Sequence, residues 1–152
     1  MIAQYATFAM AAILISAIVL EIRTGRIPNW LTALPFVIFA AVLAMAHDRT
    51  PFYWQVALAG GVFIFGLIMF AIGGMGAGAV KLMSGTVLFI PLEDAFYTLI
   101  AYLVVFFVST FIFIQIRKMF GSEDSSWHLM ANAVIPLSFS IGVAGLFGMF
   151  FV

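Results

Sequence analysis

The chain alternates between long apolar stretches and short polar segments. Five apolar stretches approach or reach the roughly 20 residues that a helix needs to cross a membrane, and they cover residues 2–20, 30–46, 55–72, 95–116 and 132–152. A sixth, weaker stretch is interrupted by glycines and Lys81, and it predicts a short helix from about Gly78 to Ile90. The pattern therefore predicts six helices joined by five loops.

Composition assigns this pattern to a membrane protein. Hydrophobic residues make up 66% of the 152 residues and charged residues only 8%, whereas soluble domains carry roughly 25% charged residues. So few polar groups cannot cover a surface that faces water. We therefore expect one domain over residues 1–152, an all-α polytopic bundle of about six transmembrane helices in a lipid bilayer.

Composition also excludes several functions. The chain has no cysteine, which removes disulfides, thiolate metal sites and thiol nucleophiles. His47 and His128 lie far apart, and neither belongs to a cluster with the spacing of metal ligands. The net charge is zero and no large basic patch exists, so nucleic acid is not an expected partner. We expect neither a metal nor a cofactor.

The cations predict the orientation of the bundle. With six spans, five of the six cations fall in loops on one side, namely Arg23, Arg26, Lys81, Arg117 and Lys118, and only Arg49 falls on the other. Cytoplasmic loops carry an excess of Lys and Arg. The shared side is therefore predicted to be cytoplasmic, with the N-terminus and the C-terminus outside.

The first polar segment, EIRTGRIPNW, has two interpretations. Pro28 suits the start of a helix and Asn29 suits a turn, so the segment reads as a hairpin with positive-inside arginines. Glu21 is unusual because it directly follows the first apolar run, at the membrane boundary. A carboxylate there is costly unless it is hydrated or paired, which also makes it a functional candidate.

The glycine-rich segment GGMGAGAVKL could likewise be a structural feature or part of a functional site. Gly74 to Gly78 forms a GxxxG pattern, whose small residues let membrane helices approach closely. Lys81 follows, and its ammonium can extend to the membrane surface. Alone, this segment indicates close helix packing.

Other polar residues point to ordinary loops. His47, Asp48 and Arg49 occupy one outer turn, and Glu93 with Asp94 occupies the other. Adjacent residues on a helix do not share a face, which argues against Glu93 and Asp94 as a catalytic pair, and we interpret these two residues as part of a solvated turn. The loop at residues 118–133 is the longest and most polar, and it is either a solvated turn or a contact for a substrate or partner.

The two motifs occur together, in order and on the same predicted membrane face. Here the chain reads Glu21-Ile-Arg-Thr-Gly-Arg-Ile27-Pro28-Asn29, then Gly76-Ala-Gly78-Ala79-Val80-Lys81-Leu82. It resembles the type IV prepilin peptidase family, membrane aspartic peptidases with a GxGD motif, and especially the short members that serve tight-adherence (Flp) pili. A proline-led apolar stretch from Ile135 to Gly142 resembles a helix near the family's C-terminus.

The resemblance implies a function. The family cleaves the basic leader from prepilins at the cytoplasmic face of the bacterial inner membrane, just before the apolar helix of the pilin. Two aspartates activate a water for attack on the peptide. The resemblance therefore implies prepilin as a partner, possible contact with other pilus-assembly proteins, and a multi-pass inner-membrane location.

Both catalytic positions depart from the family. Glu21 stands where the first aspartate is expected, and Ala79 stands where the second is expected. An aspartic dyad needs two carboxyl groups that share a proton, and Ala79 offers no acid, base or nucleophile. Loss of a general acid or base costs about 10²–10⁴-fold in rate. We expect an inactive or severely impaired enzyme, with Glu123 and Asp124 unsuited to replace the dyad because they belong to the long polar loop.

Three accounts stay open at this stage. The chain is a natural non-catalytic relative that binds prepilins or assists pilus assembly, or an active peptidase whose second aspartate was engineered to Ala79. Glu21 favours the natural account. Ala79 alone would be enough to remove activity, so an engineered variant would not need a second change from aspartate to glutamate at position 21. The third account is a small membrane scaffold unrelated to pilins.

Overall fold

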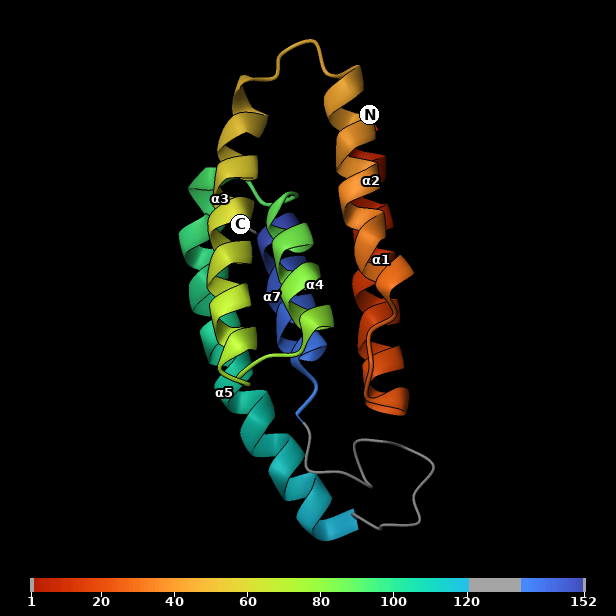
Figure 1. Cartoon of the computed structure of the whole chain (residues 1–152), viewed down its shortest axis with the longest axis vertical. Helices are drawn as coiled ribbons and strands as arrows, with labels where there is room; N and C mark the ends of the chain where they lie inside the picture. The colour runs from red at the N-terminus through yellow and green to blue at the C-terminus, as the bar shows by residue number, and fades with distance from the viewer. Residues whose placement is uncertain (1, 121–134, 152) are drawn as a thin grey trace.

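The computed structural model describes residues 2–120 and 135–151, and every regular element in those ranges is helical (Figure 1). The helices are α1 (Ile2–Thr24), α2 (Asn29–Met45), α3 (Thr50–Ala71), α4 (Ala77–Val87), α5 (Ala95–Phe120) and α7 (Leu137–Phe150), with a short 3₁₀ turn η1 (Leu92–Asp94) before α5. The all-α class is confirmed, and α4 coincides with the short helix expected at 78–90.

Prolines and glycines set the helix boundaries. Pro28 precedes α2 and Pro136 precedes α7, each in extended backbone at the N-cap position, which suits a residue that cannot continue a preceding helix. Gly25 ends α1 with a φ of +70° and donates its backbone N–H to the Glu21 carbonyl at 2.8 Å. Gly73 ends α3 with a φ of +79°. Glycine adopts this left-handed conformation without steric penalty.

Two short helices occupy the centre of the bundle. In Figure 1, α4 and α7 lie between the α1–α2 pair on one side and α3 with α5 on the other. Helix α4 packs against α3, α2 and α7, and α7 packs against α5, α1 and α4. The main apolar cluster joins these elements at Met10, Ile13, Leu14, Ala17, Leu31, Ala79, Leu82 and Ile141.

Small residues allow α7 to pack closely on three neighbours. A Cβ atom added to Gly145 would lie 2.5 Å from Thr86 Cγ2 on α4 and 3.2 Å from Leu14 Cδ1 on α1. Gly148 faces Thr98 of α5 just as closely. The hydroxyls of Ser109 and Ser140 also meet at 3.1 Å between α5 and α7. Such close backbone approach and interhelical hydrogen bonds are typical of membrane bundles.

The outer surface of the bundle is apolar. Helices α3 and α5 carry long rows of exposed large hydrophobic side chains, including Phe65, Ile68, Phe107 and Phe111. By length and composition, α1, α3 and α5 are each sufficient to cross a membrane. Helices α2 and α7 are shorter apolar helices. Helix α4, with 11 residues, is about 16 Å long, which is half the thickness of a bilayer core.

Candidate functional site

The sequence motifs meet at one end of the bundle. Helix α1 ends, and α2, α4 and α7 begin, at the lower end of the molecule in Figure 1. The last turn of α1 carries Arg23, and the last turn of α5 carries Arg117 and Lys118. We call this the charged end. Arg49 precedes α3 at the opposite end.

Glu21 reaches across the charged end to α7. The backbone N–H of Ser138 donates to Glu21 Oε2 at 2.7 Å. The Ser138 hydroxyl also donates to the Ala17 carbonyl of α1, at 3.4 Å. Ser138 lies in the first turn of α7, where backbone N–H groups have no partner inside the helix and a negative charge is favoured. The Glu21 carboxylate therefore acts as a helix cap supplied by another helix.

The Ile27-Pro28-Asn29 turn contacts the glycine-rich segment directly. A Cβ atom added to Gly78 would lie 3.0 Å from Ile27 Cβ and 3.2 Å from the Ile27 carbonyl oxygen. A larger residue at position 78 would force Ile27 to shift by a few tenths of an ångström. The Lys81 ammonium donates to Asn29 Oδ1 at 3.0 Å, so a second contact joins the same two segments.

The remaining motif residues, Pro28, Gly76 and Leu82, lie at helix starts or in the core. Pro28 accepts the backbone N–H groups of Leu31 and Thr32 as α2 begins. Gly76 is the exposed N-cap of α4, with open space around it. Leu82 is completely buried in the main apolar cluster. Neither Gly76 nor Leu82 carries a group that takes part in acid–base chemistry.

Ala79 is buried and forms part of an apolar cluster. Its exposed fraction is 2%, and it belongs to the main apolar cluster with Ala17, Leu31 and Leu82. A catalytic dyad holds two carboxyl groups close together. Among the residues that the structure describes, Glu21 is the only acid at the charged end, because Asp48, Glu93 and Asp94 belong to the turns at the opposite end. Glu123, Asp124 and His128 lie outside the described residues.

A polar-ended groove opens beside Lys81. It has a volume of about 330 Å³ and is lined by Asn29, Thr32, Ala33 and Phe36 of α2, Phe63 of α3 and Lys81 of α4. We call it the Lys81 groove. Within residues 2–120 and 135–151, no group of three or more His, Asp or Glu side chains is arranged to hold a metal ion.

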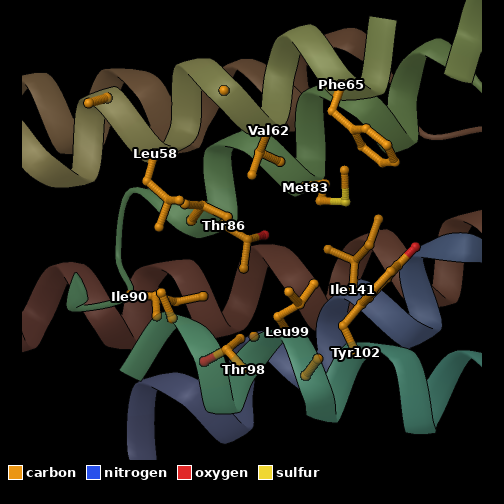
Figure 2. A pocket seen from close by; sticks show the side chains of 16 residues that line it. Leu58, Val62, Phe65, Met83, Thr86, Ile90, Thr98, Leu99, Tyr102 and Ile141 are labelled. Carbon is orange, nitrogen blue, oxygen red and sulfur yellow. The ribbon is translucent and has the colours of Figure 1, made fainter. Parts of the chain in front are cut away.

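A second cavity lies between α3 and α5 and is almost wholly apolar. Its volume is about 410 Å³. Figure 2 shows Leu58, Val62 and Phe65 of α3 facing Leu99 and Tyr102 of α5, with Met83 and Thr86 of α4 and Ile141 of α7 between them. The Thr86 hydroxyl is bonded to the Leu82 carbonyl at 2.8 Å. This cavity therefore suits apolar side chains or hydrocarbon.

Sequence reasoning missed Ser138 as the partner of Glu21. A signal existed, because Pro136 marks the start of a helix on the same predicted side as Glu21. The N–H groups after Pro136 need acceptors, and an acid at a neighbouring helix end is a suitable one. The pairing itself depends on tertiary packing and does not follow from the sequence.

Fold and site together define a helical membrane protein with two motif segments joined at one end of the bundle. Residues 8–116 match the type IV leader peptidase family. The matched region is most of the chain, and the chain belongs to this family. It includes both motif segments and stops before α7. No match was found among curated proteins or among solved structures. Family membership overturns the account of a scaffold unrelated to this family.

Proposed function

We propose that this chain binds prepilins at the cytoplasmic face of a bacterial inner membrane and does not cleave them. Membership of the type IV leader peptidase family supports prepilin as the ligand. The five cations at the charged end support the cytoplasmic assignment of that end. The proposed topology has several passes, with the N-terminus outside.

The burial of Ala79 carries the proposal of inactivity. A dyad needs one carboxylate as base and one carboxylic acid, and position 79 supplies only a methyl group inside an apolar cluster. The remaining carboxylate, Glu21, is bonded to the α7 backbone. Its position favours a structural role in joining α1 to α7.

The motif contacts support retention of a binding framework. Gly78 still lies against Ile27, and Lys81 still bonds to Asn29, so the two segments form a continuous surface. The apolar cavity between α3 and α5 adds a place for apolar side chains of a bound pilin helix. A pilin helix of several turns fills roughly 400 Å³ in each turn, whereas the whole cavity measures about 410 Å³, so the cavity receives side chains and not a whole helix.

Restoration of the missing carboxyl group tests the proposal. The parent chain, Ala79→Asp and the double variant with Glu21→Asp are purified and mixed with a leader-bearing prepilin that carries a photocrosslinker in its apolar helix. We expect the parent to crosslink to prepilin without cleaving it. Absence of crosslinking would contradict prepilin binding, and cleavage by the parent would contradict inactivity.

The restored variants separate the remaining accounts. Cleavage by Ala79→Asp alone would indicate that Glu21 serves as one half of the dyad and would favour an engineered alanine. Cleavage only by the double variant would indicate that both positions had changed together. If neither variant cleaves while both still crosslink, the family framework has been kept for binding alone, as in a natural non-catalytic relative that assists pilus assembly.

A further inference from the structure

The Lys81 groove has a polar end and an apolar end. Asn29, Thr32, Ala33 and Phe36 recur at the spacing of one face of α2. Phe36 lies seven residues into the helix from Asn29, which corresponds to about 10 Å along its axis. The ring of Phe36 is 38% exposed. The groove therefore runs from charged and amide groups at the helix start to aromatic side chains farther along α2 and α3.

The charge at the polar end is not neutralised by the described residues. Lys81 Nζ has the neutral Asn29 Oδ1 as its hydrogen-bond partner at 3.0 Å, and no described carboxylate pairs with it. An ammonium carries three N–H donors, so donors remain beyond the Asn29 contact. The Thr32 hydroxyl is already bonded to the Asn29 carbonyl. An anionic oxygen ligand at this place would meet a cation with unused donors.

The size of the groove limits the kind of occupant. About 330 Å³ is less than the roughly 400 Å³ that one turn of an α-helix fills, so a pilin helix does not fit inside. Ala33, Phe36 and Phe63 line the groove and Phe36 is exposed at the surface of the bundle, so part of a flexible hydrocarbon chain can lie along the groove while the rest stays in the bilayer. Its polar residues, Asn29 and Lys81, lie near the starts of α2 and α4 at the charged end, where the phosphate groups of a bilayer leaflet would lie.

We propose that the Lys81 groove binds an anionic phospholipid, with the phosphate at Lys81 and Asn29 and an acyl chain along Phe36 and Phe63. This inference does not rest on prepilin binding. The lipid would lie over the joint between the two motif segments. Its headgroup would therefore hold α2 and α4 together at that joint.

Native mass spectrometry of the full-length chain in detergent tests the proposal. The parent, Lys81→Gln and Lys118→Gln are each mixed with palmitoyl-oleoyl phosphatidylglycerol or with the phosphatidylcholine of the same chains. Lys118→Gln is the matched control, because Lys118 is exposed at the same end but does not line the groove. We expect the parent to bind more phosphatidylglycerol than phosphatidylcholine. In Lys81→Gln the ratio of the two bound lipids should fall about fivefold.

Three results would overturn the proposal. The first is equal binding of both lipids by the parent, and the second is an equal loss of preference in Lys118→Gln and Lys81→Gln. The third is a prepilin peptide that binds the parent but not Lys81→Gln, with lipid binding unchanged in both. That result would assign the groove to the peptide.

A second measurement keeps the proposal testable if Lys81→Gln fails to fold. Phe36→Trp retains Lys81 and places a fluorophore in the groove, in a background where Trp30, Trp54 and Trp127 are changed to Phe. Vesicles contain phosphatidylcholine with a tenth of phosphatidylglycerol, and one lipid or the other carries bromine on its acyl chains. We expect brominated phosphatidylglycerol to quench more strongly per mole, and equal quenching per mole would overturn the proposal.

Discussion

The Glu21 carboxylate of α1 accepts the backbone N–H of Ser138, in the first turn of α7, at 2.7 Å. The two residues are 117 positions apart in the chain, so this contact fixes the end of the first helix to the start of the last one. A carboxylate at a helix N-terminus is stabilising because it satisfies a free N–H and complements the helix dipole. The residue that the motif comparison predicts at the first catalytic position thus has a structural partner here.

Glu21→Ala should destabilise the folded chain through this contact. Loss of a helix cap costs about 1 kcal/mol, so the midpoint of thermal unfolding in detergent should fall. Glu21→Gln should lose less, since the amide retains an oxygen that can accept the Ser138 N–H. Glu93→Ala is the matched control, because Glu93 is an exposed acid at the opposite end. An equal loss in the Glu21 and Glu93 variants would contradict a capping role.

A carboxyl group at position 79 should strain the fold before it restores any chemistry. Ala79→Asp introduces an acid into an apolar cluster where the parent side chain is 2% exposed, and burial of an unpaired charge costs several kcal/mol. Ala79→Asn should cost less because its amide is neutral. The measurement is thermal unfolding of each purified variant in the same detergent.

The control for position 79 lies two residues earlier on the same helix. Ala77→Asp places the same side chain at the exposed first residue of α4. An acid there is favourable by about 0.3–1 kcal/mol, so Ala77→Asp should match or exceed the parent in stability. If Ala79→Asp proves as stable as Ala77→Asp, position 79 is more open to water than the structure indicates.

Much of the fold could be predicted from the sequence, because the apolar stretches are long and their boundaries carry Pro or Gly. The expected helices at 30–46 and 95–116 correspond closely to α2 and α5. The sequence predicted that the helix at about 78–90 is short, but it could not determine that α4 lies at the centre of the bundle, since its position depends on contacts with α2, α3 and α7. The number of membrane passes and the outside location of the N-terminus stay predictions.

The sequence could predict the two motifs of the candidate site, but it could not predict how their residues contact one another in the folded chain. The proposed identity of positions 21 and 79 is what the resemblance to the prepilin peptidase family implies, on two motifs matched along the chain. The contacts of Gly78 with Ile27 and of Lys81 with Asn29 were not predictable, because they join residues about 50 positions apart. The cap on Ser138 depends in addition on how α7 docks against α1.

The two glycines of the GxG motif should respond differently to substitution. Gly78→Ala places a methyl group 3.0 Å from Ile27 Cβ, so Ile27 must shift by a few tenths of an ångström, and we expect a loss of about 1 kcal/mol, at the low end of overpacking costs. Gly76→Ser should be neutral or slightly stabilising, because space around Gly76 is open and serine is a preferred N-cap residue. Thermal unfolding of the two variants compares them directly. Equal stability of both would contradict the close approach of the motif segments.

The glycines of α7 and α3 offer the sharpest test of the packing. Gly145→Ala places a Cβ atom 2.5 Å from Thr86 Cγ2 at the junction of α7, α4 and α1, whereas Gly60→Ala in α3 meets nothing within 4 Å. We expect Gly145→Ala to cost about 1–3 kcal/mol by overpacking. Gly60→Ala should gain up to about 1 kcal/mol from helix propensity. Unfolding of both variants in one detergent measures the difference, and a Gly145→Ala variant as stable as Gly60→Ala would show that α7 packs less closely on α4 than the structure indicates.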